Sequence, residues 1–183
     1  MLSNNHRKTL KELAKDSIEY GLKNGCPLSI DLVTMPSELT EQRASFVTLE
    51  KQGQLRGCIG MLEACRPLAE DIAKNSYAAA FSDPRFPPLK QSELNELSIH
   101  ISILSPPESI PCQSETDLIQ QLQPGIDGLI LDDGYHRATF LPSVWESLPK
   151  EIDFIHHLKM KAGLAENDWS DDIQAYRYTT EIF

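Results

Sequence analysis

The feature that most constrains the fold is a strict alternation of apolar and polar residues near the middle of the chain. Apolar residues at 97, 99, 101 and 103 alternate with polar residues at 98, 100 and 102. Because successive side chains of a strand point to opposite faces, this pattern predicts a strand that buries one face in a core. A chain with such a strand must build a sheet and cover one side of it.

Two amphipathic helices are predicted before this strand. Apolar residues recur at helical spacing over 10–22, and Gly25 follows as a stop signal. The Arg66-Pro67 pair indicates the start of a second helix. This helix is predicted to run to about residue 81, with acidic residues in its first turn. Asp83 precedes a proline and is therefore pushed away from helical dihedral angles, which ends this helix.

The other predicted elements alternate hairpins with single helices. They are a hairpin over 46–61, a short helix over 115–122, a hairpin over 128–141, a helix over 149–163 and an edge strand over 176–182. This order favours an α+β fold with a mixed, largely antiparallel sheet flanked by helices. A chain of 183 residues supports one sizeable core, so we expect a single domain over residues 1–183 with a smaller lobe.

Composition and charge exclude several classes of function. Acidic residues outnumber basic ones by 27 to 17, which gives a formal net charge of −10, and no basic run offsets this. We therefore expect no non-specific nucleic-acid binding. The N-terminus lacks the apolar core of an export signal, and no segment approaches ~18 consecutive apolar residues. These features predict a soluble, cytoplasmic protein with no membrane segment.

The sequence gives no pattern for a metal or a cofactor. The four cysteines are irregularly spaced and form no Cys-x-x-Cys pair, so free thiols are expected rather than disulfides, zinc or iron–sulfur sites. The adjacent His156 and His157 would point about 100° apart on a helix, which does not suit one metal ion. Phosphate-loop and dinucleotide-binding motifs are also absent, so we expect no cofactor.

The segment Arg56-Gly57-Cys58-Ile59-Gly60 is the candidate functional motif. In an extended segment the side chains of Arg56 and Cys58 project to the same face, which would place a guanidinium beside a thiol. A neighbouring cation stabilises the thiolate, which is the nucleophilic form of cysteine, provided that solvent reaches the sulfur. The same pair would also suit an anion-binding pocket. Glycine at 57 and 60 would allow a ligand to approach the backbone closely.

Each of these residues also has a structural explanation, which the sequence leaves open. Cys58 suits a small buried position under a helix, and Arg56 can simply pair with an acidic neighbour. The two glycines can equally form a bulge. Asp83 and Arg85 either line the same cleft or stabilise the helix exit. His100 or His136 would act as a general base only if the fold brought one of them to Cys58.

Taken together, these motifs resemble the AMMECR family, also described as protein A of AmmeMemoRadiSam systems. The matching segments run in the family's order over nearly the whole chain, at 46–49, 55–60, 79–81, 83–86, 141–142 and 161–164. The resemblance implies a compact α/β unit with an antiparallel-rich sheet and a smaller lobe. It also implies a Memo-like protein and a radical S-adenosylmethionine enzyme as partners. Its motifs nominate Arg56, Gly57, Cys58 and Gly60 as site residues, with Asp83 and Arg85 more weakly.

The leading hypothesis is an accessory component of a modification pathway. It would bind a small anionic or nucleobase-like ligand, or a partner protein, in a cleft lined by the 56–60 loop. One alternative is an enzyme in which Cys58 is the nucleophile, activated by Arg56 and a histidine. Another is a scaffold in which the motif is purely architectural.

Overall fold

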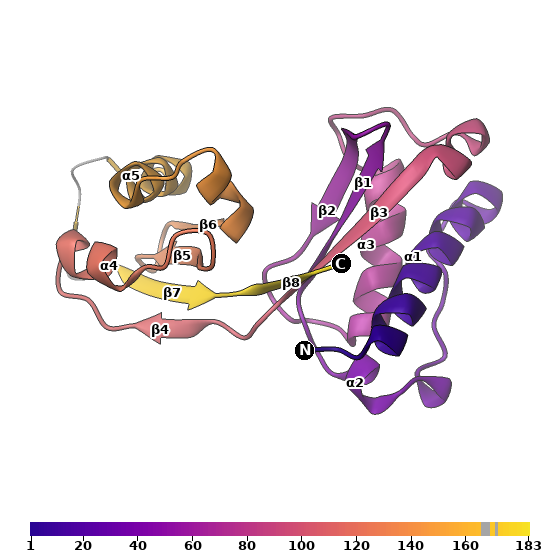
Figure 1. Cartoon of the computed structure of the whole chain (residues 1–183), viewed down its shortest axis with the longest axis horizontal. Coiled ribbons are helices and arrows are strands. Elements are labelled where there is room, and N and C mark those ends of the chain that lie inside the picture. Colours follow the sequence, from indigo (N-terminus) through magenta and orange to yellow (C-terminus); the bar gives the residue numbers. More distant parts are fainter. Residues whose placement is uncertain (166–168, 171) are drawn as a thin grey trace. The chain divides into compact units, whose positions relative to one another are not determined.

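The computed structural model describes residues 1–165, 169–170 and 172–183 (Figure 1). The described residues divide into two compact units, Met1–Leu104 with Glu181–Phe183, and Ser105–Thr180. Each unit has its own four-stranded sheet and its own hydrophobic core. The α+β class with antiparallel pairing is confirmed, but the chain builds two sheets where one was predicted. The single domain over 1–183 stays a prediction.

The first helix of the first unit is fixed by its two caps. Helix α1 (Asn4–Asn24) begins after Ser3, whose hydroxyl accepts a hydrogen bond from the His6 N–H. It ends at Gly25, which has φ of 72° and donates its N–H to the carbonyl of Gly21. Most of its apolar side is buried, with Leu10, Ala14 and Ile18 fully so, which confirms the predicted amphipathic helix.

The first sheet has the strand order β2-β1-β3-β8. Its strands are β1 (Ser45–Lys51), β2 (Gln54–Gly60), β3 (Leu97–Leu104) and β8 (Thr180–Ile182). Helix α3 (Leu68–Phe81) packs on β1 and β2, and α1 packs on α3 and β3, so both helices cover one face (Figure 1). Ile101 and Ile103 of β3 are fully buried, as the alternation predicts.

Short elements complete the first unit. They are the 3-10 turn η1 (Leu32–Thr34), helix α2 (Ser37–Thr40) and the 3-10 segment η2 (Gln91–Glu96). The segment between α3 and β3 therefore leaves the helix at Ser82 and returns through η2. No helix in the described part of the chain is both long and apolar enough to cross a membrane.

The second unit contains the sheet β4-β7-β5-β6. Its strands are β4 (Glu108–Ile110), β5 (Gly128–Asp132), β6 (Arg137–Phe140) and β7 (Gln174–Tyr178), and its helical elements are α4 (Glu115–Gln121), η3 (Pro142–Glu146) and α5 (Glu151–Ala162). The rings of Trp145 and Phe154 stack with centroids 3.7 Å apart in its core. This packing fixes η3 against α5.

The last strand region differs from the prediction. The sequence predicts one edge strand over 176–182, whereas the structure has β7 in the interior of the second sheet and β8 at the edge of the first. Strand β4, which pairs with β7, is not among the predicted elements, because three residues are too few to show an alternation. In both cases the pairing of the strands is also not visible in local periodicity.

Candidate functional site

A β-bulge shapes the motif over 56–60. The pairing of β1 with β2 is regular at Thr48 and Cys58, but its register shifts so that Leu49 faces Gly57 and Glu50 faces Leu55. Arg56 is therefore the extra residue on β2. An extra residue breaks the two-residue alternation, so Arg56 and Cys58 no longer have to present their side chains alike.

The guanidinium of Arg56 is bound inside the protein rather than offered to a ligand. Its Nε and Nη2 donate to the two carboxylate oxygens of Glu93 at 3.0 and 3.2 Å, and Nη2 also donates to the Pro87 carbonyl at 2.9 Å. This hydrogen bonding lowers the pKa of Glu93 to about 2. Nη1 is buried and has no hydrogen-bond partner among the described residues. Most N–H donors of the Arg56 guanidinium are thus used in contacts within the protein, which supports the structural explanation of this residue.

Cys58 lies on an edge strand, and its outward backbone groups are held by two side chains. Its N–H donates to Asp83 Oδ2 at 2.9 Å, and its carbonyl accepts from Arg85 Nη2 at 3.2 Å. A carboxylate and a guanidinium thus take the place that a further strand would occupy beside β2. This contact places the 83–86 segment beside the candidate motif. The sequence alone left open whether Asp83 and Arg85 lie in the same cleft as the motif or stabilise the helix exit.

Asp83 and Arg85 form a fork-to-fork pair. Arg85 Nε donates to Oδ1 of Asp83 at 2.9 Å, and Nη2 donates to Oδ2 at 2.7 Å. The Asp83 side chain is 2% exposed, whereas that of Arg85 is 54% exposed. The hydrogen bonds from Arg85 hold the pKa of Asp83 well below its ordinary value. Hydrogen bonding to Asp83 in turn raises the pKa of Arg85, and the Cys58 side chain acts in the same direction.

The thiol of Cys58 is half-buried and has polar neighbours. Its sulfur lies 3.3 Å from the hydroxyl oxygen of Thr48, which donates to it from the adjacent strand. The cation that interacts with Cys58 is Arg85, from the segment after α3, whereas Arg56 is bound to Glu93. The arginine that contacts Cys58, through its backbone carbonyl, is therefore Arg85 and not Arg56, and a pairing of the thiol with a guanidinium stays a prediction.

Phe86 and Glu93 belong to the same cluster, and neither is among the site residues predicted from the sequence. The Phe86 ring centroid lies 5.9 Å from Cζ of Arg56 and 5.6 Å from Cζ of Arg85. Phe86 directly follows Arg85, so its proximity could have been inferred from the motif. Glu93 gave no local signal, because its partner Arg56 is 37 residues away.

The two glycines of the motif are required by packing inside the unit. A Cβ at Gly57 would lie 2.1 Å from the carbonyl oxygen of Ala79 in α3. A Cβ at Gly60 would lie 2.3 Å from the ring of Phe46. Both approaches are closer than a side chain tolerates, so these positions exclude any residue larger than glycine. Direct contact of Gly57 or Gly60 with a ligand stays a prediction.

The histidines have other partners. His100 faces Thr48 across β1 and β3, and Thr48 faces Cys58 across β1 and β2, so His100 lies about 10 Å from Cys58, two strand spacings away. Its Nε2 is 3.5 Å from a carboxylate oxygen of Glu50. His136 contacts Asp133 in the second unit at 3.0 Å. Neither histidine makes a described hydrogen bond to the thiol.

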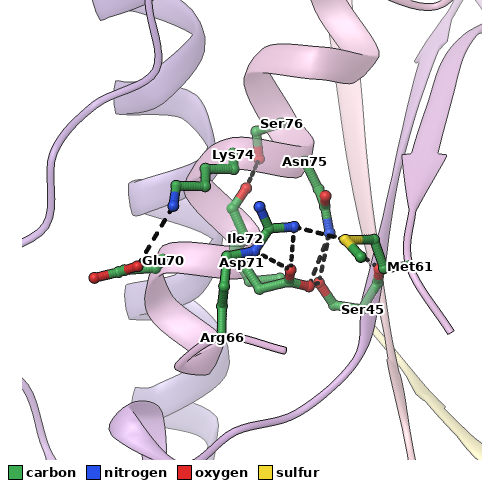
Figure 2. Close-up of polar contacts among 9 residues, drawn as sticks. All are labelled: Ser45, Met61, Arg66, Glu70, Asp71, Ile72, Lys74, Asn75 and Ser76. Atoms are coloured by element: carbon green, nitrogen blue, oxygen red, sulfur yellow. Dashed lines mark hydrogen bonds and ion pairs between the residues drawn. The ribbon is translucent and has the colours of Figure 1, made fainter. Parts of the chain in front are cut away.

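A second polar cluster lies at the other end of α3 (Figure 2). Oδ2 of Asp71 accepts from the Ser45 hydroxyl at 2.6 Å and from the Asn75 amide at 2.8 Å, while Oδ1 accepts from Arg66 Nε at 3.1 Å. A further guanidinium nitrogen, Nη2 of Arg66, contacts the sulfur of Met61 at 2.9 Å. Asp71 lies in the first turn of the helix, as the sequence predicts, but its network of partners is not visible in the sequence.

Metal ligation finds no support among these clusters. In residues 1–165, 169–170 and 172–183, no group of three or more histidine, cysteine, aspartate or glutamate side chains is arranged to hold a metal ion. The Cys58 cluster contains a hydroxyl, a carboxylate, a guanidinium and an aromatic ring in addition to the thiol.

Comparison with known proteins places the whole chain in one family. A family model described as AMMECR1 matches residues 11–183. A protein of Methanothermobacter thermautotrophicus is 36% identical over 188 residues, covering 100% of this chain and 95% of the relative. One from Thermotoga maritima is 42% identical over 153 residues, covering 82% of this chain and 83% of the relative.

A solved structure supports the same assignment. The crystal structure of uncharacterized protein PH0010 from Pyrococcus horikoshii superposes with a TM-score of 0.84 at 35% sequence identity, covering 95% of this chain and 88% of that one. The family match includes both compact units and the whole segment from 55 to 86 that forms the Cys58 cluster. The resemblance predicted from the motifs is thus confirmed, and the chain belongs to the AMMECR1 family.

Proposed function

We propose that this protein is an accessory binding component whose site lies at the Cys58 edge of the first sheet and takes a small ligand that carries a carboxylate or phosphate. The observation that carries the proposal is the exposed guanidinium of Arg85, held in place by the buried carboxylate of Asp83 beside a half-buried thiol. The ligand site predicted around Arg56 thereby shifts to Arg85.

The orientation of Arg85 favours anion binding. Its Nε and Nη2 are occupied by Asp83 and Cys58, whereas Nη1 has no partner among the described residues. A guanidinium that is already immobilised loses little conformational entropy when it binds an anion. The pairing with Asp83 reduces the net charge, so selectivity would come from directed N–H groups rather than from charge alone.

The surroundings of Arg85 favour a ligand with a flat apolar part. Phe86 lies against the same guanidinium, and Cys58 adds a polarizable sulfur. An anion bound to Nη1 would therefore have an aromatic ring and a thiol nearby. Nucleobase-like compounds with a phosphate combine the two properties, which keeps this ligand class in the proposal.

Titration of the full chain with inorganic phosphate and with adenosine monophosphate tests the proposal by NMR. We expect saturable amide shifts at Cys58, Arg85 and Phe86, with tighter binding of the nucleotide. Arg85→Ala should abolish these shifts, whereas Arg66→Ala, which removes the arginine of the other cluster, should preserve them. Absence of saturation with both probes, or equal loss in the two variants, would show that the site does not bind such anions.

The alternative of a nucleophilic Cys58 rests on two contacts, the hydroxyl of Thr48 on its sulfur and the adjacent Arg85. A variant with serine at Cys26, Cys65 and Cys112 leaves Cys58 as the sole thiol. Its alkylation rate by iodoacetamide against pH separates the alternatives. A rate that persists well below pH 8 and falls in Arg85→Ala favours an enzyme. A thiol that reacts only in denaturant removes that alternative.

The partner proteins remain part of the proposal. An accessory component of a modification pathway should associate with a Memo-like protein and a radical S-adenosylmethionine enzyme. Affinity purification of the tagged chain from its own cells, with Arg85→Ala as the matched bait, tests this. Recovery of such enzymes by the native chain supports the pathway. A scaffold that does not use this site would bind equally well in both forms.

A further inference from the structure

A groove in the first unit is unrelated to the Cys58 site. It lies between α1 and the segment 28–35 and has a volume of about 280 Å³. The apolar part of its lining consists of Leu13, Leu28, Ile30 and Met35. Leu13 is buried against the core, while the other three remain partly accessible. The groove therefore has an apolar lining, and its most buried residue, Leu13, belongs to the hydrophobic core.

The charged residues of the lining are all acidic, and Thr9 and Ser29 are its neutral polar residues. Glu12, Asp16 and Asp31 line the groove, and its nine lining residues include no lysine, arginine or histidine. All three carboxylate residues are exposed. Lys8 lies 3.8 Å from Glu12, and Asp31 accepts the Val33 N–H at 3.1 Å, whereas Asp16 has no partner among the described residues. An apolar groove with this charge is complementary to an apolar group that carries cations on its flanks.

We propose that this groove binds a short segment of a partner protein in which one or two apolar side chains are flanked by lysine or arginine. The volume of about 280 Å³ lies just below the range of about 300–1,000 Å³ that is typical of small-molecule pockets, and it fits side chains better than a whole cofactor. The apolar side chains enter between α1 and the 28–35 segment, and the cations pair with Asp16 and Glu12.

Fluorescence anisotropy on the full chain tests this with a labelled peptide of about ten residues that alternates leucine and lysine. We expect saturable binding that weakens as salt is raised, because exposed charge pairs are screened. The double variant Glu12→Gln with Asp16→Asn should weaken binding about fivefold or more, within the range for two exposed pairs. Glu19→Gln, on the same helix but outside the lining, is the matched control and should change the affinity little.

Two comparisons exclude non-specific attraction to a chain of net charge −10. A peptide with serine in place of leucine should bind at least tenfold more weakly, because the apolar contact is lost. Amide shifts on binding should cluster in 28–35 and on α1. Equal binding of the serine peptide, equal loss in the Glu19→Gln control, or no saturation would each overturn the proposal. Arg85→Ala should bind the peptide normally, which separates this result from the test of the proposed function.

Discussion

The two ends of helix α3 carry the same pair of residue types in different settings. At the start, Asp71 is bound by Arg66, Ser45 and Asn75 (Figure 2). After the end, Asp83 is bound by Arg85 and by the Cys58 N–H. The two carboxylates are 3% and 2% exposed, but Arg66 is 26% exposed and Arg85 is 54% exposed.

The difference distinguishes a structural ion pair from the proposed binding site. A buried carboxylate with an arginine is common to both ends, so it does not identify a site by itself. At the first end the Ser45 hydroxyl and the Asn75 amide join the helix to β1, which serves packing, and Arg66 binds the same carboxylate with a side chain that is 26% exposed. At the second end the carboxylate is buried while its cation keeps donors facing outward. The second arrangement leaves more of its guanidinium accessible to a further group, 54% against 26% exposed.

The largest effect is expected at the inward cluster. Asp71→Ala removes the acceptor shared by Ser45, Asn75 and Arg66, and leaves buried donors unpaired. We expect a loss of about 3–5 kcal/mol in the free energy of unfolding, measured by urea denaturation. Glu70 is the preceding residue and pairs with Lys74 at the surface. Glu70→Ala should lower the free energy of unfolding by less than about 0.5 kcal/mol. Similar costs for the two variants would remove the structural role of Asp71.

A smaller effect is expected at Asp83. Asp83→Ala leaves the Cys58 N–H without its acceptor, but the half-exposed Arg85 can be rehydrated. We expect a cost of about 2–3 kcal/mol at pH 7. Because the pKa of Asp83 is lowered in the folded state, its contribution is complete above the unfolded pKa of about 3.9 and is lost as pH falls further. The cost measured by urea unfolding should therefore shrink below pH 4; a cost independent of pH would contradict the ion pair.

Glu93 adds a third ion pair to the comparison. It binds the guanidinium of Arg56 inside the protein, so Arg56 has a structural role. With the pKa of Glu93 lowered to about 2, its pairing with Arg56 stabilises the fold above about pH 4.5 and is lost between about pH 4.5 and 2. Glu93→Gln should reduce stability by about 1–2 kcal/mol at pH 7 and flatten the acid limb of the stability profile. Thermal unfolding from pH 7 to 2 measures this. An unchanged acid limb would mean that other carboxylates govern acid unfolding.

The elements predicted correctly from sequence are those with local causes. The boundaries of α1 follow from apolar spacing and Gly25, and β3 follows from strict alternation. Helix α3 ends at Phe81, near the position set by the proline after Asp83. Nucleation, capping and burial of one face act within a few residues, so the sequence displays them directly.

The site was only partly predictable because its contacts join distant residues. Cys58 and Asp83 are 25 residues apart, and Arg56 and Glu93 are 37 apart. The bulge at Arg56 depends on the register between β1 and β2, which no single strand encodes. The motif therefore indicated a segment that the fold joins to Asp83 and Arg85, while the fold decided which arginine contacts Cys58.

The smallest effect on stability, and the most informative one, is expected for Arg85→Ala. Asp83 keeps the N–H donors of Cys58 and of residue 85, and water can replace the exposed guanidinium, so the loss should be about 1 kcal/mol or less. Arg66→Ala should cost more, because Arg66 is less exposed and serves a shared acceptor. Urea denaturation of both variants, beside the phosphate and nucleotide titrations, measures the contrast. If Arg85→Ala destabilised the fold as strongly as Asp83→Ala, its guanidinium would be part of the framework, and the two ends of α3 would no longer differ in kind.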